Sequence, residues 1–146
     1  MEEYAYVVNV EAAVVRNGTY LCIERSAQEE HAAGQLGFPG GKVEQPPGNA
    51  DPVEATARRE VREEVGVEVS DVSYVRSRTF ETEGGIPCLN VVTRCEYRCG
   101  EARPREPKEV AAVHWLGPTA VADHEACPPY LEADVEAVES HRTTSG

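Results

Sequence analysis

The fold of this chain is decided by residues 59–67, Arg-Glu-Val-Arg-Glu-Glu-Val-Gly-Val, the second half of an amphipathic helix. Asp51-Pro52 predicts where that helix begins, with the aspartate as N-cap and the proline at the first helical position. Gly66 predicts its end, because glycine readily adopts the left-handed conformation of a C-terminal cap. Apolar residues recur at every fourth position and predict a face packed against a core: Val53, Ala57, Val61 and Val65.

The same helix carries three glutamates, Glu60, Glu63 and Glu64, at spacings that place them on one face. Like charges at these spacings destabilise an exposed helix by roughly a few tenths of a kcal/mol per pair, and Arg59 alone does not balance three acids. A divalent cation would balance them, because Mg2+ prefers carboxylate oxygens, water and phosphate oxygens as ligands. From spacing alone, a solvated acidic helix face is the competing interpretation.

Outward from the helix, valine-rich and alternating segments predict strands, and Asn17-Gly18 predicts a hairpin turn between the first two. The predicted strands are residues 5–15, 20–25, 67–80, 88–97 and 110–116. Glycine and proline predict a turn over 36–42 and loops over 44–50 and 98–108. Two further helices are predicted over 118–123 and 128–140, the second with Leu131, Val135 and Val138 on one face. This order favours an α+β fold in which a mixed sheet carries helices on both faces.

Length and composition narrow the class of protein. A chain of 146 residues predicts one domain over 1–146. The net charge of −12 argues against stable nucleic-acid binding and against an anionic membrane surface. The acidic N-terminus and the lack of a long apolar run predict a cytoplasmic protein. Five cysteines without a CxxC pair predict buried free thiols, and the histidines at 31, 114, 124 and 141 show no ligand spacing.

Residues 40–67 resemble the signature of the Nudix hydrolases, the Nudix box. That signature has Gly, five residues, Glu, seven residues and then Arg-Glu-apolar-x-Glu-Glu-x-Gly-apolar. Its second half matches 59–67 at every specified position, and the lead-in from Phe38 to Glu44 is also typical of the family. The chain departs from the signature by four extra residues between Gly41 and Arg59, an insertion within 44–50. Because added loop length costs little, we expect this insertion to leave catalysis intact.

The resemblance implies an αβα sandwich with a mixed sheet and hydrolysis of a nucleoside diphosphate linked to another group. It implies Mg2+ or Mn2+ held by Glu60, Glu63 and Glu64 and by the backbone carbonyl of Gly40. Such ions lower the pKa of a bound water and neutralise charge that develops on phosphate. Glu60 is the first candidate for the general base and Glu64 the second, while Arg59 would orient glutamates through ion pairs.

Four residues outside those positions are weaker candidates. Glu109 lies where the family often places a further carboxylate, and a solvated loop acid is the alternative. Glu44 is either a neighbour of the metal site or a turn acid. Arg76 and Arg78 alternate along a strand, so they share a face and could contact substrate phosphates or pair with surface acids.

The substrate is less determined than the family. The short chain resembles the small MutT-like members that cleave nucleoside triphosphates, and it lacks the marks of the ADP-ribose and dinucleotide subtypes. A non-catalytic Nudix-fold sensor of a nucleotide ligand is the competing function, although such proteins usually lose glutamates that this chain keeps. An acidic interaction module without metal is a third reading. A homodimer is plausible, with no interface that the sequence identifies.

Overall fold

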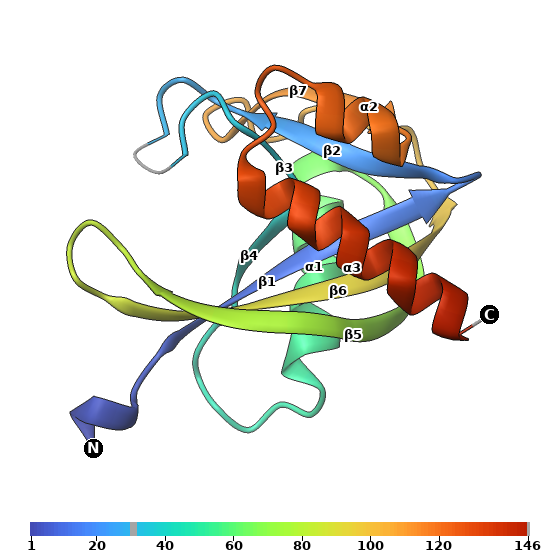
Figure 1. The fold of residues 1–146 in the computed structure, drawn as a ribbon. Coiled ribbons are helices and arrows are strands. Elements are labelled where there is room, and N and C mark those ends of the chain that lie inside the picture. Colours follow the sequence, from blue (N-terminus) through green and yellow to red (C-terminus); the bar gives the residue numbers. More distant parts are fainter. Residues whose placement is uncertain (30–31, 146) are drawn as a thin grey trace.

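The computed structural model describes residues 1–29 and 32–145, without the side chains of residues 142–145, and His31 lies outside this part (Figure 1). The strands are β1 (Val7–Arg16), β2 (Thr19–Arg25), β3 (Leu36–Gly37), β4 (Gly40–Lys42), β5 (Glu68–Glu81), β6 (Pro87–Cys99) and β7 (Val110–Leu116). The helices are α1 (Pro52–Val65), α2 (Pro118–Asp123) and α3 (Pro129–Ser145), and a 3-10 turn covers Glu2–Tyr4.

The Asn17-Gly18 pair makes the predicted tight hairpin between β1 and β2. Both residues have positive φ, 49° and 76°, as a two-residue turn matched to the strand twist requires. The two strands pair only beside the turn, at Val15 with Tyr20 and Arg16 with Thr19. β2 then continues along β7, and β1 continues between β4 and β6. This divergence leaves the far halves of β1 and β2 apart.

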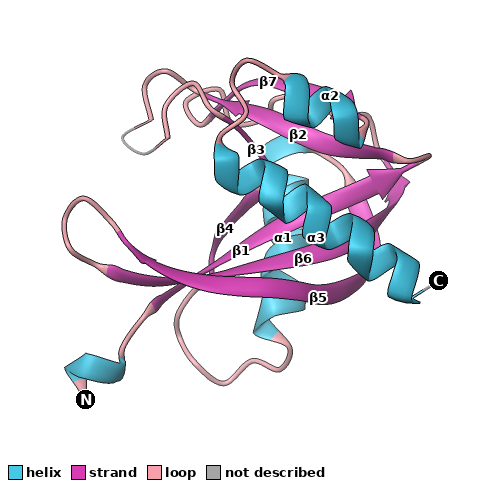
Figure 2. Cartoon of the chain, viewed as in Figure 1, coloured by secondary structure: helices cyan, strands magenta, loops and turns pink. Residues whose placement is uncertain are grey.

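One mixed sheet results, with the strand order β3-β2-β1-β6-β5, β4 beside β1 and β7 beside β2. β1 and β6 run parallel, and the other pairs are antiparallel. α1 lies on one face of the sheet, and α2 and α3 lie on the other (Figure 2). The α+β fold with an αβα sandwich is therefore confirmed.

Each helix layer buries its own apolar cluster against the sheet. On the α1 side, Ala57, Val61 and Val65 pack with Val10 and Val14 of β1. On the other side, Leu131, Val135 and Val138 of α3 pack with residues of β1, β2 and β6, among them Ala13, Tyr20 and Val92. The apolar stripes predicted for both helices are the ones that are buried. Burial of a Val or Leu side chain contributes about 1.5–3 kcal/mol, so these stripes hold both layers in place.

Local details differ from the sequence prediction in three places. The predicted turn over 36–42 contains the short strands β3 and β4, which form only because β2 and β1 pair with them. Asp51 stands at the N-cap of α1, yet its φ of 51° is left-handed and its side chain makes no capping hydrogen bond. α3 extends to Ser145, five residues past the predicted end at 140.

The cysteines test a further expectation. All five cysteines are free, and Cys22, Cys88 and Cys95 are buried as predicted. Cys99 is exposed, which corrects the prediction for that residue, because it lies at the end of β6. Among the described residues, no helix has the length and apolar character needed to cross a membrane.

Candidate active site

The contact between β4 and α1 places Glu64 beside the backbone of Gly40. The Gly40 N–H donates to Glu64 Oε1 at 2.8 Å, and the Glu64 side chain is buried. Gly40 also pairs with Glu11 of β1, and a Cβ atom at residue 40 would lie 2.3 Å from the carbonyl oxygen of Val10. Glycine is thus needed here for close approach of two backbones, and that approach fixes the position of Glu64.

Glu60 lies one helical turn earlier, against Gly41. A Cβ at residue 41 would lie 2.4 Å from the Glu60 carboxyl carbon, so a side chain there would displace this carboxylate. Arg59 holds the Glu60 carboxylate from the other side. Its guanidinium donates to Glu60 Oε1 at 3.0 Å and to the carbonyl of Lys42 at 2.9 Å, and it pairs with Glu44 at 2.9 Å. Arg59 therefore links α1 to the chain that follows β4.

Glu60, Glu64 and Glu109 share one pocket, which we call the carboxylate pocket. Its volume is about 300 Å³. Glu109 enters from the loop before β7, where its backbone carbonyl accepts from Ser26 N–H at 2.9 Å. The complete lining is Asn9, Arg25, Glu29, Gly40, Gly41, Lys42, Glu44, Arg59, Glu60, Glu64 and Glu109. Glu63 is exposed and is not part of this lining, although its charge acts on Glu60.

Electrostatics in this pocket disfavour negative charge. Burial raises the pKa of Glu64 to about 8, against a hydrogen bond from Gly40 that lowers it, and the charges of Glu60 and Glu109 raise it further. Burial also raises the pKa of Glu60, while Arg59 lowers it. Within residues 1–29 and 32–145, no cation forms an ion pair with Glu64 or Glu109. A hard divalent cation suits this donor set, because it would compensate the charge of carboxylates that form no ion pair among the described residues.

A larger cavity of about 720 Å³ opens directly beside the carboxylate pocket, and Asn9, Arg25, Glu29, Lys42 and Glu109 line both. Its walls include three aromatic side chains, Phe38, Phe80 and Tyr130. Cavities of about 300–1,000 Å³ accommodate small organic ligands, so there is room for a nucleotide next to the carboxylates.

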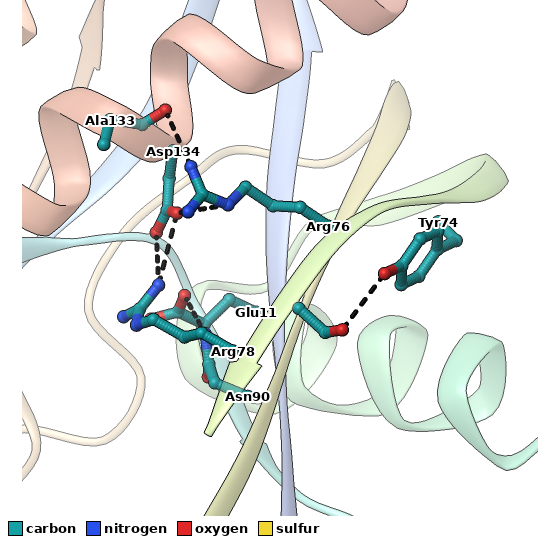
Figure 3. A network of polar contacts seen from close by, with 8 residues as sticks. Glu11, Tyr74, Arg76, Arg78, Asn90, Ala133 and Asp134 are labelled. Atoms are coloured by element: carbon teal, nitrogen blue, oxygen red, sulfur yellow. Dashed lines mark hydrogen bonds and ion pairs between the residues drawn. The ribbon is translucent and has the colours of Figure 1, made fainter. Parts of the chain in front are cut away.

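Arg76 and Arg78 point from β5 toward α3, and both reach the buried Asp134 (Figure 3). Arg78 donates to the two carboxylate oxygens at 3.2 and 3.3 Å, and Arg76 Nε lies 3.8 Å from one of them. The Arg78 guanidinium also lies 4.9 Å from the centre of the Tyr130 ring. Arg78 lines the large cavity and Arg76 does not. Their guanidinium groups are thus engaged with α3.

The cavity also contains residues that the sequence reasoning missed, Asn9, Glu11 and Asn90. Asn9 and Glu11 are polar residues two apart in an otherwise valine-rich strand. That alternation was the available signal, because it places both side chains on one face of β1. Asn90 of β6 is aligned with Asn9 across the parallel pair, which the sequence alone did not indicate.

A second polar cluster lies apart from this site. Glu24, His114 and His124 offer atoms within 4.8 Å of one another, a grouping in space that the spacing of the histidines along the sequence did not indicate. Strand pairing and the turn after α2 bring them together, which spacing along the chain does not reveal. His124 Nδ1 accepts the Ala126 N–H at 3.0 Å, so Nε2 of the neutral ring carries the proton and faces Glu24 at 3.5 Å. That tautomer favours a hydrogen bond to Glu24 over metal ligation.

Comparison with known proteins agrees with this geometry. The family profile described as NUDIX domain matches residues 5–134. The CTP pyrophosphohydrolase of Escherichia coli (strain K12) is 32% identical over 134 residues, which are 87% of this chain and 90% of that protein.

Two solved structures show the same fold. A MutT NUDIX hydrolase from Burkholderia pseudomallei has a TM-score of 0.76 and 28% identity, over 92% of this chain and 98% of that one. A MutT protein from Methanosarcina mazei Go1 has a TM-score of 0.76 and 22% identity, over 96% and 97%. With the profile covering most of the chain and Glu60 and Glu64 of its signature helix in one pocket, this protein belongs to the Nudix family.

Proposed function

We propose that this protein hydrolyses a phosphoanhydride bond in a nucleoside diphosphate linked to another group, with Mg2+ or Mn2+ as the cofactor. The observation that carries the proposal is the pair of carboxylates, Glu64 and Glu109, that line the carboxylate pocket beside a nucleotide-sized cavity and form no ion pair with a cation among the described residues. Family membership supports it. Because a relative is named a CTP pyrophosphohydrolase, nucleoside triphosphates are the first substrates to test.

The proposed metal ligands are Glu60, Glu63, Glu64 and Glu109 with the carbonyl of Gly40. The bound ion would lower the pKa of a water and neutralise charge on phosphate. Glu63 is exposed and does not line the pocket, so its assignment rests on the family signature. The Gly40 N–H and the close β1–β4 contact hold Glu64 in place for this role.

We assign the general base to Glu60 first and to Glu64 second. Burial raises the pKa of Glu60, and Arg59, which donates to Glu60 Oε1, opposes that effect and favours the charged form that accepts a proton. Burial also disfavours the charged form of Glu64, whose pKa of about 8 keeps it protonated at neutral pH before metal binds. Arg59 acts as a positioning residue, since it holds Glu60 against Gly41 and fixes the chain near Lys42 and Glu44.

Substrate contacts are proposed in two places. Glu44 lines the carboxylate pocket but pairs with Arg59, so its part in substrate binding is indirect. Arg78 lines the large cavity and is held by a hydrogen bond to Asp134. Arg76 also pairs with Asp134 but does not line the cavity. We therefore expect Arg78 to shape the cavity around a nucleotide. The single domain over 1–146, the cytoplasmic location and a homodimer stay predictions.

The test is product release from a substrate panel with Mg2+ or Mn2+. The panel holds nucleoside triphosphates, ADP-ribose, nucleotide sugars and dinucleoside polyphosphates, each run with Glu60→Gln and Glu64→Gln. Glu68→Gln is the matched control, because Glu68 is exposed just past α1 and lines neither cavity. We expect metal-dependent turnover that the control retains and both site variants lose by at least about a hundredfold.

Two other outcomes would favour a different function. Nucleotide binding without turnover on any substrate would favour the non-catalytic sensor. An absence of both metal and nucleotide binding would favour an acidic interaction surface, and Glu63→Gln would then raise the melting temperature by removing like-charge repulsion.

A further inference from the structure

Three side chains form a hydrogen-bonded row on the floor of the large cavity, and we call this row the polar relay: Asn9, Asn90 and Glu11. Asn9 Nδ2 donates to Asn90 Oδ1 at 2.7 Å, and Asn90 Nδ2 donates to Glu11 Oε2 at 3.0 Å (Figure 3 shows Asn90 and Glu11). Asn90 is nearly buried, with 2% of its surface exposed, whereas Asn9 and Glu11 are partly exposed. All three line the cavity.

The relay has a direction that the carboxylate sets. A carboxylate only accepts hydrogen bonds, so the Asn90 amide must turn its NH2 group toward Glu11 and its oxygen toward Asn9. Asn9 must then turn its own NH2 group toward Asn90. Among the described residues, Glu11 Oε1 makes no hydrogen bond, and Asn9 keeps one N–H beyond the one given to Asn90. The floor thus presents an acceptor from Glu11 beside a donor from Asn9.

The cavity around the relay suits a flat ring. Phe38, Phe80 and Tyr130 supply aromatic surface. Tyr130 is held on two sides, because its hydroxyl donates to Gln35 Oε1 at 3.2 Å and Arg78 covers its ring. Arg78 is itself fixed by the buried Asp134. Aromatic side chains and a polar row in one cavity favour a heteroaromatic base that lies against a ring and turns one polar edge to the row.

We propose that the polar relay selects nucleotides whose base carries an exocyclic amino group next to an unprotonated ring nitrogen, with Glu11 as the specificity-determining residue. The amino group donates to Glu11, and the ring nitrogen accepts from Asn9. Cytosine and adenine carry this edge. Uracil and hypoxanthine carry an oxo group and a ring N–H in those places, so their oxygen would face the Glu11 carboxylate. The proposal rests on the proposed hydrolysis of a nucleotide at the adjoining carboxylate pocket.

Two substrate pairs isolate this edge, because CTP differs from UTP, and ATP from ITP, chiefly in the replacement of the amino group by oxygen. We expect kcat/KM to be at least about tenfold higher for the amino member of each pair, because the oxo member leaves polar groups of the floor unmatched. Ratios within about twofold in both pairs would overturn the proposal.

Glu11→Gln is the decisive variant, because it keeps the shape of the side chain. With the Asn9–Asn90 pair in its present orientation, the new amide oxygen accepts the hydrogen bond from Asn90, which turns the new NH2 group toward the base. We therefore expect the preference to shift toward UTP and ITP, with the amino-to-oxo ratio falling at least about tenfold. Glu68→Gln serves as the matched control and should keep the parent ratios. A folded Glu11→Gln protein, checked by thermal unfolding, that keeps the parent ratios would contradict the role of Glu11.

Failure of the proposed hydrolysis can be told apart from failure of base selection. If no nucleotide is turned over, equilibrium binding of CMP and UMP is measured on the parent and on Glu11→Gln. Tighter CMP binding by the parent, lost in the variant, would support the relay in a protein that does not hydrolyse nucleotides. Equal binding of the two monophosphates by the parent would contradict the relay whether or not the protein is an enzyme.

Discussion

Glu64 is a residue whose surroundings disfavour its own charge. Its pKa of about 8 in the folded protein stands against an ordinary value of 4.5, and burial is the main cause. Between these values the folded state binds more protons than the unfolded state, so stability falls as pH rises from about 5 to 8. Without a bound cation, ionisation of Glu64 therefore lowers the stability of the folded protein at the position where we propose that a cation binds.

We predict that Glu64→Gln stabilises the metal-free protein at pH 8, on the order of a few kcal/mol, and has little effect at pH 5. The neutral amide can still accept the Gly40 N–H, so the change removes the charge and keeps the contact. Thermal unfolding in a chelator at both pH values measures this. An equal difference in melting temperature at pH 5 and pH 8 would argue against a buried charge as the cause.

Substitutions at the two glycines of β4 are expected to have different effects, one on stability and the other on activity. At Gly40 an added Cβ would meet a backbone oxygen of β1 at 2.3 Å, whereas at Gly41 it would meet the end of the Glu60 side chain at 2.4 Å. The Glu60 side chain can rotate away from an added Cβ, whereas the backbone of the paired strand β1 cannot. We predict that Gly40→Ala lowers the melting temperature strongly, while Gly41→Ala stays folded and loses at least about tenfold in kcat by displacing Glu60. Unfolding curves and initial rates on the two variants test this, and equal losses of stability would contradict it.

At the scale of elements, local signals predicted some boundaries and missed others. The start and end of α1 were predicted to the residue, because proline at the first position and glycine at the cap act through their own backbone. The strands β3 and β4 have two and three residues and exist only through their pairing partners. Asp51 likewise occupies the cap position with a backbone conformation that no residue type dictates. Elements that depend on distant partners are the ones that sequence reasoning missed.

The loop between β4 and α1 holds the four-residue insertion, and residues 44–50 are exposed. Arg59 binds this chain through Lys42 and Glu44, before most of the insertion. We predict that deleting residues 47–50 leaves kcat within about twofold and the melting temperature within a few degrees, because loop length changes closure entropy only slightly. A large loss of kcat with an unchanged fold would instead assign the insertion to the mouth of the site.

At the scale of the whole molecule, the glutamates of the signature helix could be predicted from the sequence better than the lining of the large cavity. Glu60, Glu63 and Glu64 lie on one helix, so their position on a common helix face could be predicted from their spacing. The relay of Asn9, Glu11 and Asn90 depends on the parallel pairing of β1 with β6, which lie about eighty positions apart in the chain. No local pattern encodes that register. The family resemblance therefore predicted the pocket proposed for the chemistry better than the cavity proposed to select the substrate.

The net charge of −12 gives the last prediction, because a nucleoside triphosphate is itself an anion. Two cations of the large cavity are already neutralised locally, Arg25 by Glu29 and Arg78 by Asp134, so the long-range field is dominated by the acidic surface. Salt shortens the reach of that repulsion from about 30 Å at 0.01 M to about 10 Å at 0.1 M. We predict that kcat/KM at saturating Mg2+ rises a few-fold over this range while kcat stays constant. Steady-state kinetics with salt as the only variable test this prediction. A fall in kcat/KM would mean that Lys42 and Lys108, which also line the large cavity, attract the substrate more strongly than the rest of the protein repels it.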